Sequence, residues 1–304
     1  MKIDKVYVIC NREDFYLTKI CIASIRYWNK DMAVCIIKDL SRNDFDSAEL
    51  EKNLNVTAEI TTIKNLTYYA KLYPLIEQEG GKRILLLDSD IVWMCDIIAL
   101  LEPFDEDIIV AGYHPEDLRA EMSRWYFTQP AFAENFPGYK YPGFLFNVGH
   151  ILCNTTIFKK DDFMQLLEWK EFPSPIKQNI FFYEQGMLNY LIAKKISEKE
   201  ITYRLFDFQV WGWDNQVKAI KKNELKNKIP HPYLVHWYGK KNGLISFLPG
   251  GKMLSFYERF YYSSIKNGKY SLYLAKFKRS ILHFRALLYE AGKCVYLFLK
   301  SPDK

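Results

Sequence analysis

Two carboxylates follow an unbroken apolar run in the first third of the chain. Asp88 and Asp90 are separated by one serine and come directly after Arg83–Leu87, a run of the kind that is buried in a parallel sheet. Hard divalent cations take oxygen ligands and keep open positions for phosphate oxygens. The pair therefore predicts a divalent-metal site, although Asp and Ser are also common in ordinary surface turns.

The segments that must position this pair alternate between strand and helix patterns. Short apolar, β-branched or aromatic runs predict strands, and apolar residues three or four positions apart predict helices. The expected strands are Val6–Cys10, Ala33–Ile37, Val56–Thr62 and Arg83–Leu87, and the helices between them involve Leu17–Ile25, Asp44–Leu54 and Thr67–Glu77. This alternation is typical of an α/β doubly wound sheet, in which ligands bind beyond the carboxyl ends of the strands.

The second half of the chain is less regular. Tyr113–Pro142 is rich in aromatic, proline and charged residues without a clear period, and we expect a long ordered loop there. The later elements are expected to be the strand Gly143–Cys153, the helices Asp161–Trp169 and Tyr183–Ala193, the strand Tyr233–His236 and the final helix Ser271–Lys300.

The positive charge lies mainly at the C-terminal end. The net charge is +6, and the residues from Ser264 onward include nine basic and two acidic ones. A diffuse nucleic-acid-binding surface is therefore not indicated, whereas a local anionic contact is. In Ser271–Lys300 apolar residues recur every three or four positions with basic residues on other faces. This pattern favours an interfacial helix attracted to anionic lipid, and the alternative is a helix that packs on the main domain.

Cysteine usage and hydropathy bear on location. The six cysteines are scattered, and we expect reduced, mostly buried thiols in a cytosolic protein. The first residues show no signal peptide, and no run of about 18 apolar residues predicts a spanning helix. The expected location is cytoplasmic, peripheral on the inner face of the cytoplasmic membrane.

Four motifs, in order, resemble those of glycosyltransferase family 8, which includes bacterial lipopolysaccharide galactosyl- and glucosyltransferases. They are Tyr69–Leu72 followed by Arg83–Val92 with its D-x-D, Phe146–Asn154 (family F-N-x-G-x-x-x-x-N), Tyr183–Asn189 (family D-Q-D-x-L-N) and Val235–Lys240 (family h-H-x-x-G-x-x-K). The resemblance covers roughly residues 5–245. It implies a GT-A fold, a Rossmann-like mixed sheet that binds a nucleotide-diphospho-sugar.

The resemblance also implies a ligand set for the metal. Asp88, Asp90 and His236 would hold a manganese ion, with His236 binding through a neutral ring nitrogen. A mixed set of carboxylates and imidazole suits Mn²⁺ better than Mg²⁺, which is nonetheless possible. The structural alternative for His236 is a polar residue that caps a strand end.

Further residues carry implied roles on the donor side. Contacts to the UDP-sugar are implied for Asn11, Lys71, Asp88, Asn147 and one of Lys240 and Lys241, and the candidate catalytic residues near the anomeric carbon are Gln185 and Glu184. The structural alternatives are an exposed helix lysine for Lys71, a turn residue for Asn11 and a satisfied strand amide for Asn147. Three positions depart from the family: Glu184 and Gly186 stand where Asp is usual, and Asn242 stands where a phosphate-binding lysine is usual.

The implied function is transfer of a hexose from a UDP-sugar to a saccharide acceptor of the lipopolysaccharide or capsule type, with retained anomeric configuration. Gln185 is a poor nucleophile, so front-face attack by the acceptor hydroxyl is favoured over double displacement. The expected division is a GT-A catalytic domain at residues 1–262 and a basic aromatic tail at residues 263–304. The expected partners are a UDP-hexose, an oligosaccharide or lipid-linked glycan, and an anionic membrane surface, without nucleic acid.

Aromatic residues are candidates for acceptor contacts, and two other functions compete. Trp125–Tyr141 and Trp211–Asp214 are candidate sugar-stacking walls or, alternatively, core segments.

The first competing function is a haloacid-dehalogenase-like Mg²⁺-dependent phosphohydrolase, which also uses a strand followed by D-x-D but expects it near the N-terminus. The second is a non-catalytic nucleotide-sugar or glycan-binding module.

Overall fold

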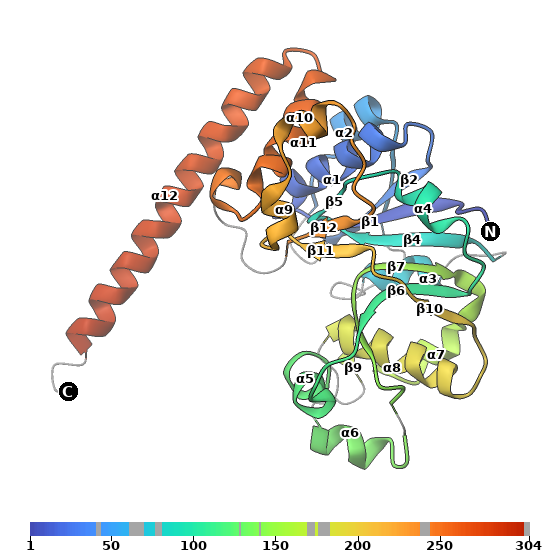
Figure 1. Cartoon of the computed structure of the whole chain (residues 1–304). Coiled ribbons are helices and arrows are strands. Elements are labelled where there is room, and N and C mark those ends of the chain that lie inside the picture. The colour runs from blue at the N-terminus through green and yellow to red at the C-terminus, as the bar shows by residue number, and fades with distance from the viewer. Residues whose placement is uncertain are drawn as a thin grey trace.

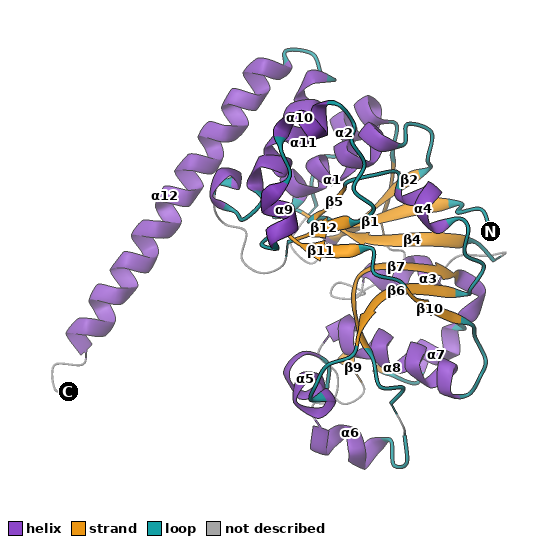
Figure 2. Ribbon diagram, in the orientation of Figure 1, coloured by secondary structure: helices purple, strands orange, loops and turns teal. Residues whose placement is uncertain are grey.

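A seven-stranded mixed sheet runs through the molecule, and a three-stranded sheet lies beside it (Figure 1). The strand orders are β10-β6-β7-β4-β1-β2-β3 and β11-β12-β5. The computed structural model describes residues 1–40, 44–60, 70–76, 81–127, 129–139, 141–168, 174–175, 183–237 and 244–300. Strands and helices alternate through the first half, as the sequence predicts (Figure 2).

The strands have the following bounds. The large sheet contains β1 Lys5–Asn11, β2 Val34–Asp39, β3 Thr57–Ile60, β4 Arg83–Asp88, β6 Ile108–Tyr113, β7 Leu145–Asn154 and β10 Tyr203–Leu205. The small sheet contains β5 Ile91–Trp93, β11 Gln209–Trp211 and β12 Leu234–His236, and a separate pair is formed by β8 Leu167–Glu168 and β9 Ser174–Pro175.

The helices surround these sheets. Their bounds are α1 Phe15–Trp28, α2 Ala48–Leu54, α3 Tyr73–Ile76, α4 Ile97–Leu101, α5 Leu118–Trp125, α6 Gln129–Asn135, α7 Lys160–Met164, α8 Tyr183–Ser197, α9 Asn215–Ala219, α10 Lys222–Lys226, α11 Gly251–Ser263 and α12 Gly268–Lys300. Short 3₁₀ turns occur at Ala70–Leu72, Thr155–Ile157 and Ile245–Phe247.

The large sheet is buried on both faces. Along β4, Leu85 and Leu87 belong to the core that contains α1 and α11, whereas Ile84 and Leu86 belong to the opposite core with α8. Alternate residues of a strand point to opposite faces, so a wholly apolar strand must have a core on each side. This confirms the expectation for Arg83–Leu87, with one difference: β4 pairs parallel with β1 but antiparallel with β7.

The turn after β4 joins the two sheets. Ser89 and Asp90 form the turn, and the chain then enters β5 of the small sheet. β5 pairs antiparallel with β12, which sets His236 opposite Ile91, and the Trp237 N–H donates to the Asp90 carbonyl over 3.1 Å. A segment late in the chain is thereby fixed beside the two acids.

The pairing of β7 with β6 is irregular near the turn that carries the two acids. Val110 of β6 pairs with Ile151, but Gly112 pairs with Phe146, so the β7 residues between leave the β6 ladder. β7 pairs with β4 as far as His150, which lies opposite Leu87. Irregularities of this kind re-aim side chains and are frequent next to active sites.

Two expectations for the middle of the chain are wrong. Tyr113–Pro142 is not an irregular loop, because it contains α5 and α6. Asp117 caps α5 by accepting from the Ala120 N–H over 2.9 Å, and both helices are too short to show a clear period. The helix expected at Asp161–Trp169 ends at Met164 and is followed by β8.

Helix α12 projects from the body beside α11 (Figure 1). Arg279 pairs with the buried Glu258 of α11, and its guanidinium lies 5.7 Å from the ring centroid of Tyr16 in α1. On the part of α12 whose side chains the structure describes, several large apolar residues are exposed, including Tyr273, Phe277 and Phe284. Among the helices that the structure describes, none combines the length and apolar character needed to cross a membrane.

Candidate functional site

Three predicted metal ligands meet at the carboxyl end of β4. Asp88 is the last residue of β4, Asp90 lies in the following turn, and His236 ends β12. One ligand atom from each lies within 4.8 Å of the other two, and Nε2 of His236 is 3.2 Å from Oδ1 of Asp90. Residues separated by almost half the chain therefore converge as the resemblance implies.

The donor set fits a divalent cation. Burial lowers the pKa of His236 to about 4, against the opposing effect of Asp88, so the ring is neutral at pH 7. Its Nδ1 is buried without a hydrogen-bond partner among the described residues. Two carboxylates and a neutral imidazole, packed with their ligand atoms together, form a donor set that a divalent cation can bind.

A buried lysine neutralises part of this acidic cluster. Nζ of Lys71 lies 2.7 Å from Oδ1 of Asp88 and 3.6 Å from Oε1 of Glu184. Burial by itself lowers the pKa of Lys71, but the two carboxylates outweigh burial and raise it above its usual value. Lys71 is therefore a charged ammonium group inside the site, and not the exposed helix lysine that was its alternative.

Glu184 is held on the other side of Lys71. Burial raises the pKa of Glu184, and Lys71 acts in the opposite direction. Its neighbour Gln185 accepts a long hydrogen bond of 3.5 Å from the Val148 N–H. Asn147 accepts from the Gly149 N–H over 2.7 Å, which leaves its amide nitrogen able to donate to a ligand.

Gly149 permits the close approach of these groups. A Cβ atom at this position would lie 2.6 Å from Oδ1 of Asn147, 2.6 Å from Cε1 of His236 and 2.8 Å from Oδ2 of Asp88. Atoms do not approach this closely without displacement, so any residue larger than glycine would push these three side chains aside. Gly149 belongs to the motif that suggested the family, but sequence reasoning gave it no role.

Sequence reasoning also missed His150. It is fully buried, and its ring centroid lies 6.1 Å from that of His236 and 5.2 Å from that of Phe208. Neither ring nitrogen has a hydrogen-bond partner in the part of the chain that the structure describes. Burial, reinforced by His236, lowers the pKa of His150 to about 3.

The structure says less about the remaining residues that were predicted to contact the donor. Asn11 ends β1, and its Oδ1 accepts from the N–H groups of Glu13 and Asp14 over 2.8 Å and 3.0 Å. This is the turn geometry that formed the structural alternative for Asn11. Lys240 and Lys241 lie outside the described residues.

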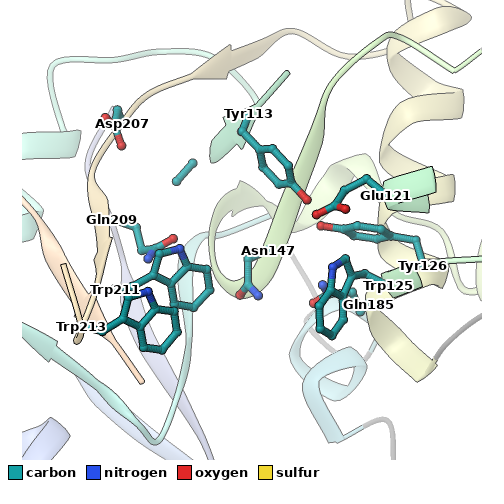
Figure 3. Close-up of a pocket in the computed structure, with 12 residues that line it drawn as sticks. Tyr113, Glu121, Trp125, Tyr126, Asn147, Gln185, Asp207, Gln209, Trp211 and Trp213 are labelled. Atoms are coloured by element: carbon teal, nitrogen blue, oxygen red, sulfur yellow. The ribbon is translucent and has the colours of Figure 1, made fainter. Parts of the chain in front are cut away.

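A cavity of about 560 Å³ adjoins this cluster (Figure 3). One wall presents Asp207, Gln209, Trp211 and Trp213, and the opposite wall presents Tyr113, Glu121, Trp125 and Tyr126. Asn147 and Gln185 lie between the walls, with Ala111 and Gly112 completing the lining. The volume is within the range of small-molecule sites, about 300–1,000 Å³.

The first wall follows the alternation of an extended chain. Asp207, Gln209, Trp211 and Trp213 are every second residue, whereas Phe208 and Val210 between them are buried. This period was present in the sequence and would have identified Asp207 and Gln209. The predicted aromatic candidates divide: Trp125, Trp211 and Trp213 line the cavity, whereas Phe132 and Phe136 pack against Tyr190 in the core.

A stack of three rings connects the cavity with the metal ligands. The indoles of Trp211 and Trp213 are 5.1 Å apart at an interplanar angle of 4°, and Trp211 also stacks on His236 at 5.1 Å and 26°. The cavity wall is thus in direct contact with a ligand of the candidate metal site.

Three solved glycosyltransferase structures have a fold similar to that of this chain. WbbM, a bifunctional glycosyltransferase, aligns with a TM-score of 0.55 and 14% identity over 91% of this chain and 52% of its own. The galactosyltransferase LgtC, in complex with donor and acceptor sugar analogues, aligns at 0.54 and 16% over 85% of this chain and 95% of its own. GlyE of Streptococcus pneumoniae TIGR4 aligns at 0.50 and 15% over 92% and 64%.

The fold is that of the GT-A glycosyltransferases. The chain spans about half of WbbM and less than two thirds of GlyE. No protein-family model and no curated protein sequence matches it.

Replacing Gly149 tests the close packing of the site. In Gly149→Ala the added methyl group pushes apart Asn147, His236 and Asp88, and we expect Mn²⁺ affinity to fall about tenfold or more, measured by calorimetry. Gly138→Ala is the control, because Gly138 has a φ of 78° but no atom within 4 Å of an added Cβ. Equal Mn²⁺ affinity in Gly149→Ala and wild type would contradict this account.

The buried histidines predict a pH-dependent stability. In the unfolded chain both histidines become protonated below about pH 6.5, whereas in the folded chain burial lowers the pKa of His150 to about 3 and that of His236 to about 4. The free energy of unfolding of the metal-free protein should therefore fall with pH, by up to about 1.4 kcal/mol per unit for each group. In His150→Leu the fall below pH 6.5 should be shallower, as measured by urea unfolding.

The effect of His150→Leu on packing can be separated from its effect on protonation. At about pH 8 the histidines of both proteins are neutral in the folded and the unfolded chain. The difference in the free energy of unfolding between His150→Leu and the wild type at that pH therefore reports the change in packing alone. A slope equal to that of the wild type would mean that His150 is protonated as easily in the folded as in the unfolded chain.

Proposed function

We propose that this protein is a metal-dependent glycosyltransferase that transfers a hexose from a UDP-sugar to a saccharide acceptor. The observation that carries the proposal is the convergence of Asp88, Asp90 and His236 beside a buried lysine and an aromatic cavity. The fold shared with LgtC, whose solved structure contains donor and acceptor sugar analogues, supports it.

On the donor side, the proposed manganese ion would be held by Asp88, Asp90 and His236, with Mg²⁺ as the second choice. When bound there, the ion would neutralise charge on a departing diphosphate as a Lewis acid. Lys71 adds a preorganised positive charge at the same place, since its ammonium group is already fixed by Asp88 and Glu184. Asn11, Asn147 and one of Lys240 and Lys241 are proposed as further donor contacts.

For the chemical step we propose front-face attack with retention. The bond between the anomeric carbon and the diphosphate oxygen breaks, the acceptor oxygen bonds to that carbon, and the departing phosphate oxygen takes the acceptor's proton. Glu184 is engaged with Lys71, and Gln185 is a poor nucleophile, which argues against a glycosyl adduct on either. Gln185 instead orients the sugar beside Asn147.

The cavity is the proposed acceptor site. It begins at Asn147 and Gln185, the residues proposed to lie at the transferred sugar, and its walls carry indole rings. Flat aromatic rings offer apolar faces for sugar rings, and the polar groups between them can fix hydroxyls. A lipopolysaccharide- or capsule-type glycan is the proposed acceptor.

The tail is a proposed membrane contact on the cytoplasmic side. Residues 1–262 would form the catalytic domain, and residues 263–304 the basic tail. Tyr273, Phe277, Ile281, Phe284 and Leu288 recur every three or four residues and are all exposed on α12. An exposed apolar stripe beside basic residues is the arrangement that binds anionic interfaces.

The proposed function predicts metal-dependent release of UDP. The protein is incubated with Mn²⁺ and a panel of UDP-hexoses, with and without saccharide acceptors, and UDP is measured. Asp90→Asn and His236→Ala should each lower turnover about 100-fold or more, because each removes a metal ligand. Calorimetry with UDP and Mn²⁺ gives a second readout that needs no acceptor.

His114→Ala is the matched control, since His114 is exposed and lies outside the metal cluster. Turnover that survives removal of metal by a chelator would exclude the proposal. Phosphate release from phosphomonoesters alone would favour the phosphohydrolase, and UDP-sugar binding without turnover would favour a binding module.

The tail proposal predicts binding to anionic vesicles. The full chain should sediment with vesicles of phosphatidylglycerol and phosphatidylcholine at low salt, and less so with phosphatidylcholine alone. Phe277→Ser combined with Phe284→Ser should reduce sedimentation severalfold, because both side chains are exposed on the apolar stripe. Trp125→Ser, an exposed aromatic residue on α5, is the control. Equal sedimentation of both variants would contradict a role of the stripe.

A further inference from the structure

The described lining of the cavity beside the candidate metal site carries acidic side chains and no basic ones. Among its described lining residues, Glu121 and Asp207 are the charged ones, and they lie on opposite walls (Figure 3). Oε2 of Glu121 lies 3.8 Å from Nη1 of Arg124, whose side chain is 67% exposed. An exposed pair of this kind is weak and screened, so it leaves most of the negative potential in place.

Asp207 is available to a ligand. Its side chain is exposed, and within the described ranges it makes neither a hydrogen bond nor an ion pair. Two residues further along the same wall, Nε2 of Gln209 is buried without a hydrogen-bond partner in the described part of the chain. Buried polar atoms are normally satisfied, so an unpartnered one in a cavity wall points to a ligand.

Glu121 is oriented by neighbouring residues of its own wall. Figure 3 shows the hydroxyls of Tyr113 and Tyr126 pointing toward its carboxylate. Burial raises the pKa of Tyr113, and Glu121 acts in the same direction. The carboxylate is therefore set among phenol groups that remain neutral, and no positive group in the described lining faces it.

We propose that this cavity selects acceptors whose bound sugar rings carry no negative charge, and that a free amino group on such a ring is favoured over a hydroxyl. The inference rests on the proposed function, because it takes the cavity as the acceptor site. The two carboxylates accept hydrogen bonds from hydroxyl or ammonium groups and repel a uronate or a phosphorylated sugar. The indole walls bind the ring faces regardless of charge.

The test is a comparison of matched glycosides. Dissociation constants are measured for methyl glucoside, methyl glucosaminide with a free amine and methyl glucuronide, and for the galacto series, by saturation-transfer NMR with UDP and Mn²⁺ present. In at least one series we expect the glucosaminide type to bind tightest and the uronide weakest, about fivefold weaker than the neutral glycoside. The difference should shrink at high salt, since these carboxylates are partly exposed.

Neutral isosteres assign the effect to the two acids. The double variant Asp207→Asn with Glu121→Gln keeps the shape of the cavity and should reduce the discrimination to less than about twofold. Glu116→Gln is the matched control, because Glu116 is an exposed acid just before α5 that does not line the cavity. It should keep the wild-type discrimination.

Several outcomes would overturn the inference: uronides that bind as tightly as neutral glycosides, discrimination that persists in the double variant, or no binding of any probe. The proposed function is tested separately by UDP and Mn²⁺ calorimetry. If UDP and Mn²⁺ bind but charge selectivity is lacking, only this inference fails. If UDP and Mn²⁺ do not bind, the proposed function fails.

Discussion

The antiparallel pairing of β5 with β12 is the contact on which the site depends. It fixes His236 opposite Ile91, directly after the turn that carries Asp90. His236 ends a strand of the small sheet and Asp88 ends a strand of the large sheet, so this pairing is what holds the histidine beside the two carboxylates. The free energy that holds three mutually crowded polar groups together is supplied by the buried strands on either side.

Much of the fold followed from periodicity. The first four strands and the last helix were predicted because each is long or apolar enough to show its period alone, and β4 with its acids identified the candidate metal site. His236 required the family resemblance, since a three-residue strand such as β12 has no measurable pattern of its own. The structure then brought His236 and the acids together.

The features that were missed arise from tertiary contacts. The short helices α5 and α6 have too few turns to reveal a period, and the irregular pairing of β7 with β6 depends on both strands at once. Gly149 was visible as a motif residue, but the need for glycine is set by side chains from β4 and β12 that surround it. Asp207 and Gln209 were detectable in principle, because they share the alternation of the tryptophans after them.

The stacked rings of Trp213, Trp211 and His236 have a thermodynamic consequence. Trp213 and Trp211 line the cavity and Trp211 stacks on His236 of the candidate metal site, so a ligand that moves the indoles can affect the imidazole through direct ring contact. Binding free energies at two such sites are reciprocal. If a ligand in the cavity increases the cation affinity by some factor, the bound cation increases the affinity for that ligand by the same factor. The order in which the two bind therefore affects the rates but not the occupancies at equilibrium.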